Sequence, residues 1–182
     1  MQSFSLFWTI IIYGSVICLI CLFPRSRKFY RRAFDFNVLK EPKTYQFIII
    51  AFLAIFIANL VIFNRSLSST FDLLTSDFSL TALLKGMELF QFILYIVIIA
   101  PIMEEMLFRI PLSILMNKKT YFIIGLLISS VLFAFLHPDY PLFGFTLGVT
   151  LGIIFKLSNS IVPAILLHII WNVFSLFYYN YI

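Results

Sequence analysis

The sequence predicts an all-α fold, a polytopic bundle of about six membrane-spanning helices. Of its 182 residues, 62% are hydrophobic and 12% are charged, whereas soluble domains are closer to half apolar and a quarter charged. The many aromatic residues, with only 6 Gly and 7 Pro, exclude disordered and collagen-like chains. Because each crossing needs roughly 20 apolar residues, this length leaves no room for a separate soluble domain.

Six apolar stretches mark the expected spans. They are residues 4–23, 45–63, 83–116, 121–136, 143–157 and 161–179. Positive charge follows the first stretch instead of preceding it, which predicts a retained helix and not a cleaved signal peptide. The third is too long for one straight crossing, and we expect Pro101 and Pro111 to kink or end it. The polar residues 65–80 predict an external loop.

Lys and Arg residues indicate which ends of the helices face the cytoplasm. Seven of the 13 lie between Arg25 and Lys43, directly after the first span, and Lys118, Lys119 and Lys156 mark later turns. Since cytoplasmic loops are enriched in basic residues, both chain termini are predicted outside. This distribution does not indicate nucleic-acid binding, because the charges are not gathered on one soluble face.

Ionisable side chains within the spans are candidates for function, because each costs roughly 2.5–3.5 kcal/mol to insert. They are Glu88, Glu104, Glu105, Arg109 and His168, with His137 at a helix end. Glu105 and Arg109 lie four residues apart on one helix face, in the order that favours an ion pair. Glu104 points about 100° away and faces another neighbour. His168 and Asn172 also share a face.

Depth in the membrane tests whether these groups meet. Counted from the cytoplasmic turns at ~1.5 Å per residue, Glu104, His168 and Asn172 lie near the same mid-membrane level, and His137 is shallower. We therefore expect the four side chains to converge. Glu88 lies near the external end and is interpreted as structural or interfacial. Residues 1–80 are expected to contain no polar group at membrane depth.

A carboxylate, two His and an Asn in a dry site fit a hydrolase that activates water without a covalent intermediate. The carboxylate would act as general base, one neutral His would hold the water, and the second His with Asn would stabilise an oxyanion. No Ser/His/Asp set is apparent. Two His and a carboxylate could also ligate zinc, and spacing alone does not decide between the two.

Each group also has a structural interpretation. Glu105 and Arg109 could form a buried pair, His168 with Asn172 an interhelical hydrogen-bond clamp, and His137 could simply end a helix at the interface. The occurrence of the whole set in one short chain favours a functional site.

Three motifs carry a family resemblance. Glu104-Glu105-x-x-x-Arg109, Phe133-x-x-x-His137 and His168-x-x-x-Asn172 resemble, in order and spacing, those of the CAAX-protease and bacteriocin-processing family. It is also called the abortive-infection or CPBP family of intramembrane proteases. Between the last two motifs, Gly144, Gly148 and Gly152 form one smooth helix face that allows a close helix approach. A departure is Ile110 after Arg109, where the family often has Gly.

The resemblance implies a membrane endopeptidase, often described as glutamate-dependent. Residues 81–182 would form its catalytic transmembrane core, and residues 1–80 a variable part of helices and external loop. By motif, the implied roles are activation of water by Glu104 with His137, oxyanion stabilisation by His168 and Asn172, and support by Glu105 and Arg109. No cofactor is implied, although older descriptions of the family invoke a divalent metal such as zinc.

The expected function is therefore endopeptidase cleavage of a membrane-associated peptide or protein in the lipid bilayer. A bacterial plasma membrane, and a role in bacteriocin processing or self-immunity, fit the bacteriocin-linked branch of the family. The alternative is a non-catalytic membrane immunity or scaffold protein that binds a bacteriocin or another membrane partner. A transporter is a third interpretation, which the lack of a visible repeat disfavours.

Overall fold

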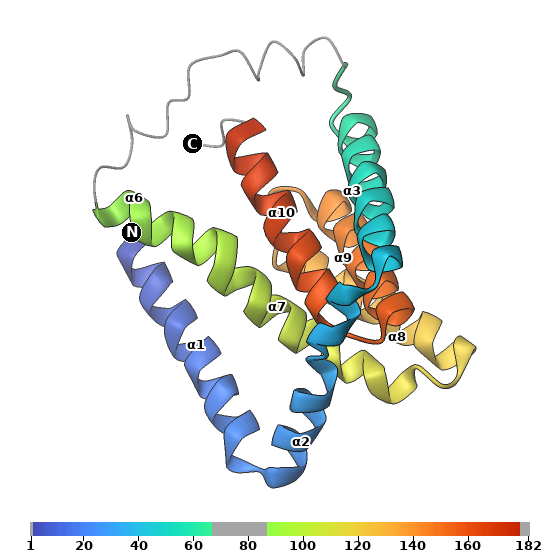
Figure 1. Ribbon diagram of the computed structural model, residues 1–182. Helices are drawn as coiled ribbons and strands as arrows, with labels where there is room; N and C mark the ends of the chain where they lie inside the picture. Colours follow the sequence, from blue (N-terminus) through green and yellow to red (C-terminus); the bar gives the residue numbers. More distant parts are fainter. Residues whose placement is uncertain (1, 67–86, 179–182) are drawn as a thin grey trace.

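The computed structural model describes residues 2–66 and 87–178, which form helices and short connections without any β-strand (Figure 1). An all-helical fold is thereby confirmed for these residues. For residues 2–10, 21, 87–89 and 177–178 only the backbone is described. The predicted external loop therefore lies outside the described residues beyond Ser66, as does the side chain of Glu88.

Five helices correspond one to one with predicted apolar stretches. They are α1 (Gln2–Leu22), α3 (Pro42–Ile62), α8 (Lys119–Phe135), α9 (Pro141–Ser158) and α10 (Val162–Tyr178). Among the described residues, α3 and α9 are long and apolar enough to cross a membrane. Two further apolar helices, Lys119–Phe135 and Val162–Leu176, are shorter. The number of crossings and the outward orientation of the termini stay predictions.

The long third stretch is interrupted as its prolines predict. It consists of α6 (Met87–Leu94), a π-helical turn η2 (Tyr95–Ile99), α7 (Ala100–Phe108) and a 3₁₀ segment η3 (Ile110–Leu115). Pro101 and Pro111 are each the second residue of a new segment. Proline lacks a backbone N–H and its ring clashes with the preceding turn, so the helical pattern changes near each proline.

The basic stretch after α1, predicted only as a loop, is largely helical. It contains α2 (Pro24–Ala33) and a 3₁₀ turn, η1 (Phe36–Lys40). The end of α2 is tied to the start of α10, because Ile161 N–H donates to the Ala33 carbonyl oxygen at 2.9 Å. This connection joins the N-terminal part of the chain to the helix that carries His168 and Asn172.

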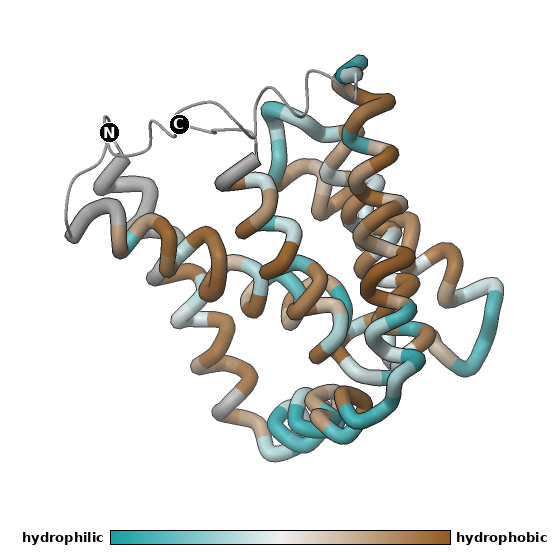
Figure 2. Tube along the Cα trace, turned by 45° about the horizontal axis from the view of Figure 1, so that its top comes forward, coloured by the Kyte–Doolittle hydropathy of each residue, from teal (hydrophilic) through white to brown (hydrophobic). Residues whose placement is uncertain are grey.

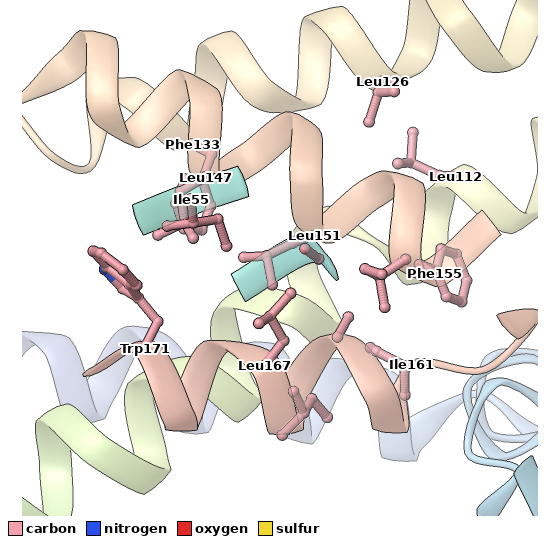
Figure 3. Packing of buried hydrophobic residues seen from close by; sticks show 14 of the residues in the cluster. Ile55, Leu112, Leu126, Phe133, Leu147, Leu151, Phe155, Ile161, Leu167 and Trp171 are labelled. Carbon is pink, nitrogen blue, oxygen red and sulfur yellow. The ribbon is translucent and has the colours of Figure 1, made fainter. Parts of the chain in front are cut away.

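The core forms where α9 packs against α8, α3 and α10 (Figure 3). Its fully enclosed side chains include Ile55, Phe133, Leu151 and Leu167. The outer faces are also apolar: on α3, Ile50 is 65% exposed and Val61 74%. Large apolar side chains on the outer surface of a helical bundle that buries charged groups inside are expected where lipid replaces water as the solvent.

Glycines bring α8 and α9 together as the sequence predicts. A Cβ atom added at Gly148 would lie 3.1 Å from the Cα atom of Ser130, and one at Gly144 would lie 3.3 Å from the Cα atom of Ala134. The two backbones are therefore in direct contact along this face. Because His137 follows α8 immediately, the same contact determines its place relative to α9.

Candidate active site

One partly open cavity of about 690 Å³ brings the four predicted catalytic residues together. Glu104 from α7, His137 from the turn after α8, and His168 and Asn172 from α10 all line it. These residues span 69 positions in the sequence and three motifs, so only the packing of the helices makes them neighbours. Their catalytic roles stay predictions, but their convergence is a property of the structure.

Beside the cavity, Glu105 and Arg109 form a fully enclosed ion pair. The Arg109 Nε atom lies 3.1 Å from Glu105 Oε2, and both side chains are 0% exposed. Arg109 Nη1 also donates to the Ser129 hydroxyl at 3.0 Å, and its guanidinium lies 5.0 Å from the Phe133 ring centroid. The pair joins α7 to α8, and sequence reasoning identified it without finding Ser129.

His168 lies between the two glutamates. Its Nδ1 atom is 3.2 Å from Glu105 Oε1, and its Nε2 atom is 3.8 Å from Glu104 Oε2. Because an ionised carboxylate only accepts hydrogen bonds, Nδ1 carries a proton and donates to Glu105. Glu105 thus uses one oxygen for Arg109 and the other for His168. The ion pair with Arg109 was predicted from the sequence, whereas the bond from His168 to Glu105 was not.

His137 is oriented by the first residue of its own motif, Phe133. The His137 Nδ1 atom is 3.0 Å from the Phe133 carbonyl oxygen, and the two rings stack with centroids 4.7 Å apart. A carbonyl oxygen only accepts, so Nδ1 carries the proton and Nε2 of the neutral ring is an acceptor. Gly144 leaves the necessary space, because a Cβ there would lie 3.1 Å from His137 Cβ.

Asn172 has one role that the sequence did not indicate. Its Nδ2 atom donates to the Ile96 carbonyl oxygen at 2.9 Å, which links α10 to η2. An amide nitrogen carries two protons, so this bond leaves a second N–H and the Oδ1 atom for other partners. Asn172 can therefore support the backbone before α7 and still present a donor to the cavity.

Asn59 is a cavity residue that sequence reasoning missed. It lies near the end of α3, is 4% exposed, and lines the same cavity as Glu104 and His137. Residues 1–80 therefore contribute a polar side chain to the cavity, which the sequence analysis did not predict. A signal was present: an amide four residues after Ile55, within an apolar span, falls on the buried face of the helix.

The remaining cavity wall combines six aromatic side chains with aliphatic ones and with the polar Asp139 and Ser175. The aromatic lining residues are Phe63, Phe92, Tyr95, Tyr140, Phe143 and Trp171. Tyr95 is also bonded to a further part of the chain, because the Tyr13 side chain in α1 hydrogen-bonds it. Acidic, imidazole and amide groups therefore share one space with apolar rings, which is the usual composition of a site for an organic ligand.

The described part of the chain contains no cluster of three side chains of the types that bind zinc, which are His, Cys, Asp and Glu. His168 uses Nδ1 for Glu105, and His137 uses Nδ1 for a carbonyl, so each could offer only Nε2. Metal-binding imidazoles commonly donate their other ring N–H to a carboxylate or a carbonyl in this same way, so the bonds at Nδ1 fit either mechanism.

Buried carboxylates and imidazoles between membrane helices indicate a functional site, because such groups are costly to bury there. Residues 86–174 match the family described as type II CAAX prenyl endopeptidase Rce1-like, and the match includes all three motifs. This part of the chain is therefore similar to the Rce1-like membrane endopeptidases, in agreement with the three motifs. Comparison with curated proteins gives no match, and comparison with solved structures gives none either.

Proposed function

We propose that this protein is an intramembrane endopeptidase in which Glu104 activates the water that cleaves a peptide bond. The observation that carries the proposal is the position of Glu104, which faces the cavity together with His137 and His168 while Glu105 is engaged with Arg109. Glu104 can thus take part in the reaction, whereas Glu105 holds the ion pair with Arg109. The similarity of residues 86–174 to a family of membrane endopeptidases supports a protease.

In the proposed reaction, the Nε2 acceptor of His137 holds a water molecule and Glu104 removes one of its protons. The oxygen of that water attacks the carbonyl carbon of the substrate and gives a tetrahedral intermediate. Glu104 then passes the proton to the amide nitrogen, the C–N bond breaks, and an acid and an amine leave. No covalent bond to the protein forms, and no oxidant or reductant is needed.

The developing oxyanion needs donors fixed before the reaction. The second N–H of Asn172 is one candidate, because the first is held by the Ile96 carbonyl and fixes the amide plane. His168 is the other: when its ring carries both protons, Nε2–H donates toward the cavity. Glu105 orients this ring through Nδ1, and Arg109 in turn orients Glu105.

The substrate that suits this cavity is an apolar, membrane-associated peptide or protein segment. Aromatic rings can pack against its side chains, and Asn59 adds an amide to the cavity wall. The family description names CAAX prenyl substrates. For this chain we propose a peptide of a bacterial plasma membrane, with processing or inactivation of a bacteriocin as one physiological setting.

Comparison of peptide termini in the native host tests the proposal. Cells with the wild type, Glu104→Gln or the surface control Glu41→Gln are compared at equal membrane abundance. Termini that vanish only with Glu104→Gln would establish proteolysis and name the substrate. Identical termini in all three strains, with the phenotype intact, would contradict it and favour the non-catalytic immunity or scaffold alternative.

A metal-dependent variant of the mechanism is tested on the purified protein. Activity that a chelator abolishes and zinc restores would contradict the role of Glu104 as the group that activates water unaided. Activity unchanged by the chelator is the expected result.

A further inference from the structure

We propose that α2 is a binding surface for anionic phospholipid headgroups. This inference is independent of the proposed function, because it concerns a charged surface outside the cavity and outside the residues that match the protease family. It starts from the distribution of charge. Residues 24–43 contain seven Lys and Arg residues and two acidic residues. The net charge of this segment is therefore +5, the same as that of the whole chain.

The basic residues of α2 lie on one side of the helix. They are Arg25, Arg27, Lys28, Arg31 and Arg32, and all five are exposed. At about 100° per residue they fall within an arc of about 160°. Phe29, Tyr30 and Ala33 occupy the opposite side and pack against the core of the bundle. The helix is therefore amphipathic, with its apolar face already satisfied by the protein.

No described side chain is a counter-ion for the charges on this face. Among the described residues, none of the five cations forms an ion pair, and the acidic Asp35 accepts instead from the Asn37 backbone and side chain. Five positive charges within ten residues repel one another. A negatively charged surface next to this face would offset that repulsion. A cluster of four to eight Lys or Arg beside a membrane helix is typical of anionic-lipid binding.

The position of α2 favours lipid over a soluble acidic partner. It follows α1 directly, and Figure 2 shows it as a hydrophilic segment next to the largely hydrophobic tube of α1. Exposed apolar side chains flank it: Leu22 is 64% exposed, Phe23 59% and Phe36 64%. Cations next to exposed aromatic and aliphatic groups match the border between headgroups and acyl chains.

The surface is held in place and is not a loose tail. Besides the bond from Ile161 N–H to the Ala33 carbonyl oxygen, the Ser160 hydroxyl donates to the Asp35 carbonyl oxygen at 2.9 Å. The Asp35 N–H also donates to the Ser160 Oγ atom at 3.2 Å. A fixed array of cations binds without a cost for ordering the backbone.

Lipid selectivity of the full-length protein tests the proposal. The protein is placed in phosphatidylcholine bilayers, and the association of spin-labelled phosphatidylglycerol is compared with that of spin-labelled phosphatidylcholine. The variant Arg27→Gln/Lys28→Gln removes two α2 charges. The control Lys118→Gln/Lys119→Gln removes two exposed charges from the turn before α8. Glutamine keeps nearly the same helix propensity.

The wild type should select phosphatidylglycerol, the α2 variant should lose most of that selectivity, and the control should keep it. Added salt should weaken the selectivity of the wild type, because the attraction is between charges near water. Equal association of both lipids with the wild type would overturn the proposal and leave an acidic protein segment as the partner of this face. Equal losses in the two variants would overturn it as well, since any cationic turn would then suffice.

Discussion

Asn172 donates a hydrogen bond to the carbonyl oxygen that Pro101 leaves without a backbone donor. In the π-helical turn, each N–H bonds to the carbonyl five residues earlier, and Ala100 N–H donates to the Tyr95 oxygen in this way. The next donor in that pattern would be residue 101, and its acceptor would be Ile96. Proline has no N–H, and the Nδ2 atom of Asn172 takes that place at 2.9 Å.

This relationship predicts a specific coupling between Asn172 and Pro101. Asn172→Ala leaves the Ile96 carbonyl oxygen without its donor, and the free energy of unfolding in detergent should fall by about 1–3 kcal/mol. In a Pro101→Ala background the backbone supplies an N–H, so the same substitution should cost less. A double-mutant cycle by denaturant titration measures the difference.

The same double-mutant cycle distinguishes the structural role of Asn172 from its proposed role in the reaction. If Asn172 stabilises the oxyanion as proposed, Pro101→Ala restores stability to the Asn172→Ala protein but not peptide cleavage. Recovery of both together would show that Asn172 serves only the backbone of η2. Additive costs in the cycle would contradict the coupling itself.

The two adjacent glutamates should differ when each is replaced by glutamine. Glu104→Gln should lower cleavage by about 10²–10⁴-fold, the usual contribution of a general base, with thermal stability nearly unchanged. Glu105→Gln leaves Arg109 charged in an enclosed site, and breaking such a pair costs about 3–5 kcal/mol. Loss of stability in both variants, or in neither, would contradict the division of roles.

Activity and thermal denaturation are measured on the same purified samples, with Glu41→Gln as the surface control. The Glu41 carboxylate is half exposed in its pair with Lys43, so its replacement should change neither quantity.

Much of this architecture could be predicted from the sequence because apolar runs of membrane length correspond to single helices. The prolines indicated where the third run changes its helical pattern, and the spacing of Glu105 and Arg109 indicated their ion pair. These are local properties, determined by residues within one or two turns of each other. The three motifs likewise indicated the side chains that line the cavity.

The contacts between distant elements were not predictable in the same way. The bond from Asn172 to Ile96 depends on how α10 packs against η2, and His168 reaches Glu105 across 63 residues. Asn59 was missed because a single amide does not reverse the apolar character of a span. Its direction into the cavity depends on the packing of α3 against α9 and α10.

Replacement of two α9 glycines by alanine should lower the cleavage rate to different degrees. At Gly144 the new Cβ would lie 3.1 Å from His137 Cβ and 3.3 Å from the Ala134 Cα atom, so the turn that carries His137 must move. At Gly152 it would meet the end of the Leu126 side chain, which can rotate away. Gly144→Ala should therefore lower cleavage more than Gly152→Ala does.

Cleavage rate and thermal denaturation of both alanine variants check this expectation. A reaction needs its catalytic groups in place within a fraction of an ångström, so a small shift of His137 is enough to slow it. If Gly152→Ala proved the more harmful for cleavage, the proposed role of His137 would not explain the glycine at position 144.

Asn59 should act on substrate binding more than on the chemical step. Its amide lies in the cavity wall and belongs to none of the three motifs, so we place it on the side that holds the peptide. Asn59→Leu keeps the branched shape of the side chain and removes one hydrogen bond to the substrate. A neutral hydrogen bond contributes about 0.5–1.5 kcal/mol, which corresponds to a rise in KM of about 2- to 12-fold with kcat little changed.

Once the substrate is known, steady-state kinetics at equal protein stability measure both constants. A fall in kcat at constant KM would instead place Asn59 at the reacting atoms, and the division between a binding wall and a catalytic wall in this cavity would then be wrong.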